Sequence, residues 1–183
     1  IIDDVAHMKS EIGLLYYNDF NRPVLEKLIH TNELTFTELF TAHPHIFIGK
    51  NHPLANKDVV SMDELEEYPY ISFEQGDHNS FYFSEEIFST VVRPKHIRVR
   101  DRASLFSLLL GLDGYTVSSG VIDEEVNGEN IISVPLAEEG LMHIGYITNN
   151  KMHRSRLGQE YIHALEQYVG NYGRHIQLPE TNE

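Results

Sequence analysis

The sequence contains no cysteine. This absence excludes disulfide bonds, thiolate nucleophiles and zinc sites with cysteine ligands, and it fits a reducing compartment. No stretch approaches the roughly 20 apolar residues that a membrane-spanning helix needs. No charged and then apolar export leader is recognisable either. We therefore expect a soluble, cytoplasmic protein.

The sequence is also poor in basic residues, with 14 Lys and Arg against 28 Asp and Glu and a formal net charge of −14. A chain of this charge repels phosphate backbones, so we do not expect it to bind DNA by itself. It has no Gly-rich phosphate loop, nucleophile elbow or HExxH pair. These absences favour a binding protein over an enzyme, and no cofactor is predicted.

The chain does contain a regular alternation of strand-like and helix-like segments. Short apolar or β-branched runs predict strands at residues 12–16, 34–37, 45–48, 70–73, 97–99, 115–117, 131–134 and 143–147. Amphipathic spacing and capping residues predict helices at residues 1–8, 22–29, 62–67, 80–91, 101–112 and 157–169. Asn21, Asp101, a Ser61–Glu64 capping box and Asn79 or Ser80 are the expected caps. The alternation predicts α/β layers around mostly parallel sheets.

Three short motifs follow one another after the strand at 45–48. They are residues 52–55 (HPLA), 60–65 (VSMDEL) and 68–71 (YPYI), and a fourth follows at residues 108–117 (LLLGLDGYTV). In this order they resemble the effector-binding domain of LysR-type transcriptional regulators.

The likeness runs from about residue 5 to residue 170. The sequence departs from the family pattern at Asp113 and at residues 118–120 (SSG), where the family has aliphatic residues and Leu-Pro. In the family, a helix-turn-helix domain and an opening strand-helix-strand precede the position of Ile1. We therefore expect an N-terminally truncated effector domain.

The resemblance implies two Rossmann-like lobes of the periplasmic-binding-protein type II kind, with a central ligand cleft. Lobe I would hold residues 1–45 and 146–170, lobe II would hold residues 46–145, and residues 171–183 would form a loose polar tail. The implied function is sensing of a small effector by a homodimer or tetramer that controls DNA binding through the helix-turn-helix domain. A solute-binding protein of a transporter is the main alternative, and a small α/β enzyme is a more distant one.

The resemblance also implies which residues contact the effector. They come from strand ends, from one strand-to-helix turn and from the start of one helix: Tyr16, Tyr17, Phe73, Glu74, Gln75, Arg100, Arg102, Ser104, Ser118 and Ser119. The alternative for the two tyrosines is that one ring packs in the core and the other covers it.

Arg98, Arg100 and Arg102 are the densest basic cluster in this acidic chain. Alternation places Arg98 and Arg100 on one strand face beside the start of a helix. An anionic effector, such as a carboxylate or a phosphate, would find both charge and free amides there. The alternative is a solvated face whose arginines pair with nearby glutamates.

Two further groups of residues raise alternatives of their own. His43, His45 and His52 lie close together, the first two on one expected strand face, but no carboxylate completes a ligand set and no metal is predicted. Phe81, Tyr82 and Phe83 are consecutive on an expected helix and cannot all face one core. We expect that one of the three contacts a partner subunit, although Tyr82 could simply be exposed.

Overall fold

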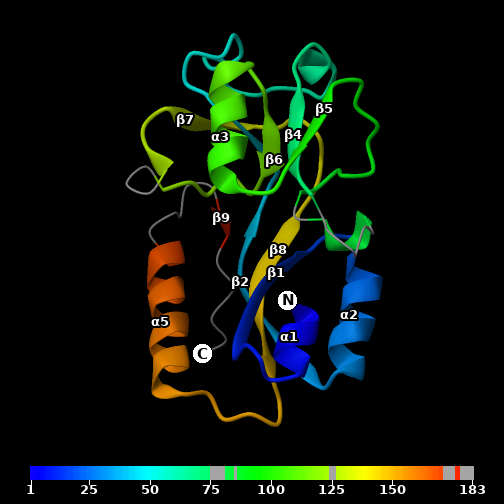
Figure 1. Cartoon of the computed structure of the whole chain (residues 1–183), viewed down its shortest axis with the longest axis vertical. Helices are drawn as coiled ribbons and strands as arrows, with labels where there is room; N and C mark the ends of the chain where they lie inside the picture. The colour runs from blue at the N-terminus through cyan, green and yellow to red at the C-terminus, as the bar shows by residue number, and fades with distance from the viewer. Residues whose placement is uncertain (75–80, 85, 124–126, 171–175, 178–183) are drawn as a thin grey trace. The chain divides into compact units, whose positions relative to one another are not determined.

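The chain begins one folding unit, passes into a second and then returns to the first (Figure 1). The computed structural model describes residues 1–74, 81–84, 86–123, 127–170 and 176–177. Unit 1 consists of Ile1–Ala42 and Leu141–Glu183, and unit 2 consists of His43–Gly140. Each unit has its own hydrophobic core.

The sheet of unit 1 is antiparallel throughout. It contains β1 (Ile12–Tyr17), β2 (Leu34–Ala42), β8 (Met142–Asn149) and β9 (Ile176–Gln177) in the order β1-β8-β2-β9. The strand that returns from unit 2, β8, pairs with β1 on one side and with β2 on the other. The pairing of β9 with β2 shows that the expected loose tail is wrong for these two residues.

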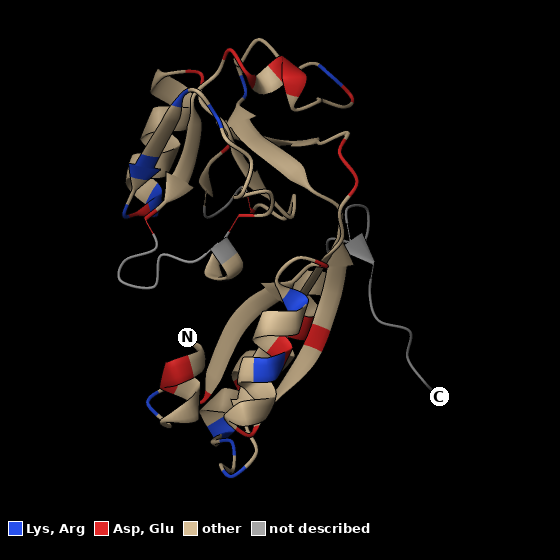
Figure 2. Ribbon diagram, turned by 90° about the vertical axis from the view of Figure 1, so that its right-hand side faces the viewer, with Lys and Arg blue, Asp and Glu red and all other residues tan. Residues whose placement is uncertain are grey.

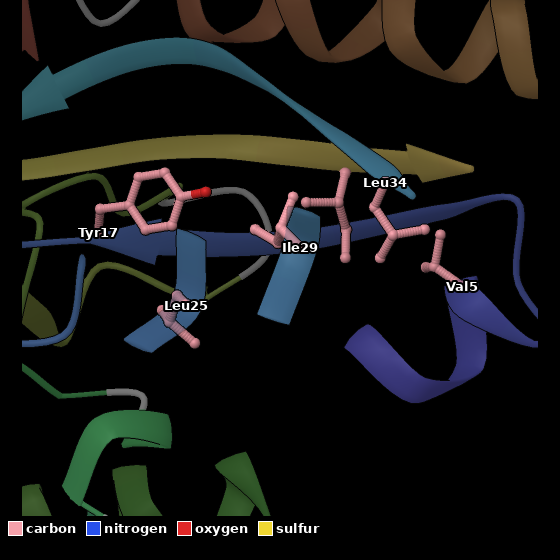
Figure 3. Close-up of a cluster of buried hydrophobic side chains, with 6 residues drawn as sticks. Val5, Tyr17, Leu25, Ile29 and Leu34 are labelled. Atoms are coloured by element: carbon pink, nitrogen blue, oxygen red, sulfur yellow. The ribbon is translucent and has the colours of Figure 1, made fainter. Parts of the chain in front are cut away.

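Helices cover both faces of this sheet. The helices α1 (Ile2–Ala6) and α2 (Arg22–Thr31) lie on one side and α5 (Arg156–Gly170) on the other (Figure 1). The side chains under α1 and α2 form one buried cluster, drawn in Figure 3: Val5, Tyr17, Leu25, Ile29, Leu34 and Ile147. The two members of the cluster in α2, Leu25 and Ile29, are four residues apart, as the amphipathic pattern predicts.

The start of α5 is held by a carboxylate from another part of unit 1. Glu11 accepts hydrogen bonds from the Ser155 hydroxyl at 2.9 Å and from its N–H at 3.3 Å. The same hydroxyl accepts the N–H of Gly158 at 3.1 Å. These bonds satisfy backbone donors at the helix start and orient α5 on the sheet.

The sheet of unit 2 is mixed. An antiparallel part contains β3 (His45–Gly49) between β6 (Thr116–Ser118) and β7 (Ile131–Pro135). A parallel part contains β4 (Tyr70–Phe73) and β5 (His96–Val99). A parallel bridge between Tyr70 and Tyr115 links the two parts.

The helix α3 (Arg102–Gly111) packs against this sheet. Its buried Leu105 and Leu109 meet Phe47, Ile71 and Val99 in the core of unit 2. Asp101 caps the helix as predicted, because its carboxylate accepts the Ser104 N–H at 2.8 Å.

The expectation of mostly parallel sheets is wrong. Among the described residues, β4 and β5 form the only parallel ladder, and every other ladder is antiparallel. In unit 1 the physical reason is that β8 runs back into the unit in the direction opposite to β1 and β2. Alternation of helices and strands along a sequence does not determine the direction of each strand.

Three local expectations are also wrong. The helix at 62–67 is a single 3-10 turn, η1 (Asp63–Leu65), and the helix at 80–91 is reduced to η2 (Phe81–Phe83) followed by turns. Asn21 precedes α2 but makes no side-chain cap. Its Oδ1 accepts the N–H of Asn18 at 2.7 Å, because the buried side chain ties the preceding turn together. Asn79 and Ser80 lie outside the described residues.

Arg93 explains how the segment after η2 is held without a helix. Its Nη1 donates to the carbonyls of Phe88 and Val91, each at 3.0 Å, and its Nε donates to the Tyr115 hydroxyl at 3.1 Å. The guanidinium carbon lies 3.9 Å from the centre of the Tyr70 ring, within the range of a cation–π contact. One arginine therefore joins this loop to β4 and to the residue that precedes β6.

In the described part of the chain, no helix is both long enough and apolar enough to span a membrane.

Gly145 tests the packing of β8 between its neighbours. A Cβ at this position would overlap the carbonyl oxygen of Thr37 and the ring of Phe36. We expect Gly145→Ala to lower the free energy of unfolding by about 1–3 kcal/mol, measured by urea denaturation. Gly111→Ala is the matched control, because its Cβ meets open space and should leave stability unchanged or slightly higher. Equal effects of the two substitutions would contradict this packing.

Candidate functional site

The carboxyl ends of β4 and β5 bring two predicted site residues together. Glu74 follows β4 and Arg100 follows β5, and the Nε of Arg100 pairs with the carboxylate of Glu74. The backbone N–H of Glu74 donates to the Val99 carbonyl at 2.8 Å, which fixes the strand ends. The hydrogen bond and charge of Arg100, aided by the charge of Arg98, lower the pKa of Glu74. Arg100 therefore does pair with a glutamate.

The last residue of β4 is held by a carboxylate that the sequence did not reveal. The N–H of Phe73 donates to Glu86 Oε1 at 2.8 Å, and the Ser84 hydroxyl donates to Glu86 Oε2 at 3.0 Å. Glu86 is buried, with 4% of its surface exposed. The sequence feature that could have identified Glu86 is a glutamate placed among apolar residues. Gln75 lies outside the described residues.

The start of α3 is occupied by its own capping residue. Asp101 Oδ1 accepts the Ser104 N–H and Oδ2 accepts the Ser104 hydroxyl, both at 2.8 Å. These bonds, backbone first, lower the pKa of Asp101. Arg102 donates from Nη1 to the side-chain oxygen of Asn127 at 3.2 Å. Ser104 is thus used within the helix cap.

Ser118 and Ser119 lie at the end of β6. Ser118 is paired across the ladder with His45 of β3, and the Ser119 hydroxyl accepts the Val121 N–H at 3.4 Å. Gly120 adopts a φ of +83°, and a Cβ there would lie 2.7 Å from the His45 ring. The turn after Ser119 therefore requires glycine, because it lies directly on a buried imidazole.

The two tyrosines belong to unit 1, and they differ from each other. Tyr17 is buried, with its ring centre 4.3 Å from that of Phe36, and burial raises its pKa to about 12. Its ring therefore packs in the core, which was the alternative to a ligand contact. Tyr16 is half-buried, and its carbonyl accepts the Asn21 Nδ2 at 3.3 Å.

A histidine–glutamate contact that sequence reasoning missed lies beside Tyr17 in the sheet of unit 1. His143 stands opposite Tyr17 in the β1–β8 register. Its Nδ1 is 2.7 Å from Glu38 Oε2 on β2, next to the register shift between Glu38 and Phe40. The two partners are 105 positions apart. No local pattern could have joined them.

Several predicted site residues thus come together in unit 2: Phe73, Glu74, Arg100, Arg102 and Ser104 lie at the ends of β4 and β5 and the start of α3. Ser118 and Ser119 lie at the end of β6 in the same unit, whereas Tyr16 and Tyr17 lie in unit 1. Basic residues occur on both units and are interspersed with acidic ones (Figure 2).

His52 of the HPLA motif has a structural role. The Leu54 N–H donates to its Nδ1 at 3.0 Å, so the proton is on Nε2, which donates to the Asp113 carbonyl at 3.0 Å. The ring also packs 4.4 Å from that of Tyr68 and is buried. Burial lowers the pKa of His52. This histidine ties the loop after β3 to the turn after α3.

His43 and His45 do not share a strand face as expected, because His43 lies outside both neighbouring strands. His43 precedes β3 and is exposed, with its Nδ1 3.1 Å from the Gly140 carbonyl. His45 is buried in β3, with its Nδ1 2.8 Å from the His43 carbonyl. Within the described ranges, no group of three or more His, Asp or Glu residues is arranged to hold a metal ion.

The capping box forms in part. Glu64 Oε2 accepts the Ser61 N–H at 3.1 Å, as predicted. The Ser61 hydroxyl donates to the same carboxylate at 3.3 Å instead of accepting a helix amide. The Met62 N–H is instead bound by Glu138 at 2.7 Å.

The fold defines a two-unit α/β module. Residues 19–170 match the family model described as the LysR substrate binding domain. The chain therefore belongs to this family, whose members are transcriptional regulators. No functionally curated protein matches the sequence significantly.

Solved structures of LysR regulators share the fold. HinK from Pseudomonas aeruginosa has a TM-score of 0.60 at 14% identity over 93% of this chain and 56% of its own. The effector-binding domain of QuiR, in complex with shikimate, has a TM-score of 0.56 at 18% identity over 94% of this chain and 76% of its own. That of BenM, with its effector benzoate, has a TM-score of 0.58 at 16% identity over 99% of this chain and 78% of its own.

These likenesses confirm the α/β class and the periplasmic-binding-protein type II-like architecture. The chain spans little more than half the length of HinK.

His52 should make unit 2 sensitive to acid. Because its pKa is lowered in the folded state, its contribution to stability is present above the ordinary histidine pKa, near 6.5, and is lost as the pH falls through the folded value. We expect the free energy of unfolding to fall from pH 7 to pH 5. We expect His52→Asn to remove part of that dependence and to cost about 1–3 kcal/mol at pH 7 by leaving buried groups unpaired.

The measurement is urea unfolding at several pH values. His163→Asn is the control, because His163 is exposed on α5. An unchanged pH dependence in His52→Asn would contradict the assigned role.

Proposed function

We propose that this chain is the effector-sensing domain of a LysR-type transcriptional regulator and has no catalytic activity of its own. The family match over residues 19–170 is the observation that carries the proposal. A small metabolite would bind the domain and change how the whole regulator binds DNA. The DNA-binding function would reside in a separate helix-turn-helix domain, because this chain has a net charge of −14 and would repel a phosphate backbone. Such a regulator would act in the cytoplasm.

We further propose that units 1 and 2 are the two regulatory lobes of the family. The unit boundaries, at residues 42/43 and 140/141, lie within a few residues of those expected from the sequence. We propose effector contacts in unit 2 by Phe73, Arg100, Arg102, Ser104, Ser118 and Ser119. Of the two predicted contacts in unit 1, Tyr16 is half-buried, whereas the ring of Tyr17 packs in the core.

An anionic effector is favoured by two observations. Three exposed arginines lie where β5 ends and α3 begins, namely Arg98, Arg100 and Arg102. The effectors bound to the related QuiR and BenM domains, shikimate and benzoate, are carboxylates. A planar carboxylate matches the fork of an arginine guanidinium.

A metabolite screen by thermal shift tests this function. We expect carboxylates or phosphates, and not their neutral amides, to raise the melting temperature, because a ligand at 100 times its Kd adds about 2.7 kcal/mol of stability. Arg102→Gln should reduce the shift, whereas Arg154→Gln in unit 1 should not. Stabilisation by neutral compounds alone would contradict an anionic effector, and no stabilisation by any metabolite would contradict effector sensing.

Self-association is a second proposed property. Tyr82 and Phe83 on η2 expose 37% and 38% of their surfaces, more than aromatic residues in a core would. The side chain of Phe81 is outside the described set. We propose that this segment contacts a second copy of the chain in a dimer or tetramer.

Sedimentation velocity tests this interface. We expect Phe83→Ser to shift the protein toward monomer by about tenfold in Kd, since an aromatic anchor at an interface contributes at least 1–2 kcal/mol. Leu157→Ser is the control, because Leu157 is 80% exposed on α5, away from this segment in sequence. A monomeric wild-type protein at high concentration, or equal effects of both substitutions, would contradict the proposal.

A further inference from the structure

Three carboxylates of the chain itself occupy donor groups at the strand ends of unit 2. Glu74 pairs with the Arg100 guanidinium, and Glu86 accepts the Phe73 N–H. Asp101 accepts both donors of Ser104 at the start of α3. An anion arriving from solution therefore finds each of these donors already bound to a carboxylate of the chain.

The three carboxylates differ in how easily they can be displaced. Glu86 is buried and bound by two donors, so its removal would leave buried groups unpaired. Asp101 accepts two hydrogen bonds, both of 2.8 Å, from Ser104 in the first turn of the same helix. The side chains of Arg100 and Glu74 are 83% and 43% exposed. Exposed ion pairs contribute little to stability, because water and salt compete with them.

The backbone around Glu74 does not depend on its ion pair. The Glu74 N–H is held by the Val99 carbonyl at 2.8 Å, through the ladder of β4 and β5. The Glu74 side chain can therefore leave Arg100 without disturbing either strand. Arg98, two positions before Arg100 at the same strand end, adds positive charge that an incoming anion would share.

We propose that Glu74 is an intramolecular competitor of the effector: its carboxylate occupies Arg100 in the unbound domain and is displaced when a carboxylate-bearing effector binds Arg100. This inference rests on the proposed effector-sensing function. The apparent affinity for an anionic effector is then reduced in proportion to the fraction of molecules in which Arg100 is not bound to Glu74. The chain thereby tunes its own sensitivity through one side chain.

Isothermal titration with benzoate, and with benzamide as its neutral counterpart, tests the inference in four proteins. They are the wild type, Glu74→Gln, Arg100→Gln and the control Glu67→Gln, whose carboxylate lies 3.5 Å from Lys95 in the same unit. We expect Glu74→Gln to bind benzoate roughly three- to fivefold more tightly than wild type, the range that an exposed ion pair allows. Arg100→Gln should lose most of the benzoate affinity, and Glu67→Gln should match wild type.

Two results would overturn the inference. One is that Glu74→Gln binds benzoate no more tightly than wild type, or that Glu67→Gln gains as much. The other is that benzoate binds none of the four proteins. In either case, the thermal-shift screen distinguishes failure of the competitor role from failure of effector sensing. If a metabolite stabilises all four proteins equally, effector sensing stands and the competitor role of Glu74 falls. If no metabolite stabilises any of them, both fall.

Discussion

The pairing of β8 with two strands at once is the constraint on which unit 1 depends. β1 and β2 lie on either side of β8, so the sheet closes only when the chain has returned from unit 2. Gly145 allows this close approach, because Phe36 and the Thr37 carbonyl occupy the space of a side chain. Glu38 and His143 then join β2 and β8 near the point where both strands reach the unit boundary. β2 and β8 are therefore linked to each other next to the residues at which the chain passes between the units.

Three buried or half-buried polar side chains of unit 2 bind backbone groups and hold its loops in place. His52 binds a backbone donor and a backbone acceptor, Arg93 binds two carbonyls and a phenol, and Glu86 holds the end of β4. Buried polar groups that are paired in this way specify one arrangement of loops, since any other would leave them unpaired. The Glu74–Arg100 pair differs from these contacts because both of its side chains are exposed. The proposed displacement of Glu74 would take place on strand ends that these contacts hold in position.

Much of the local structure could be predicted from residue patterns. The strand at 70–73 and the helices α3 and α5 follow from apolar spacing, from Asp101 as a cap and from Gly170 at the end. The prediction of a helix at 80–91 was wrong because Arg93 binds the backbone carbonyls of this segment and holds it as a loop. The spacing of apolar residues does not reveal such a contact. Glu86 and the Glu38–His143 pair were missed for the same reason, since their partners are distant in sequence or are backbone atoms.

The sequence by itself determined the α/β class, most element positions and the likeness to the LysR effector-binding family, because these depend on periodicity, caps and ordered motifs. Strand direction, the burial of Tyr17 and the pairing of Arg100 with Glu74 were decided only by the tertiary structure. These features depend on which segments meet after the chain crosses into unit 2 and returns. A one-dimensional pattern carries the chemistry of each residue but not the identity of the neighbour that will neutralise it.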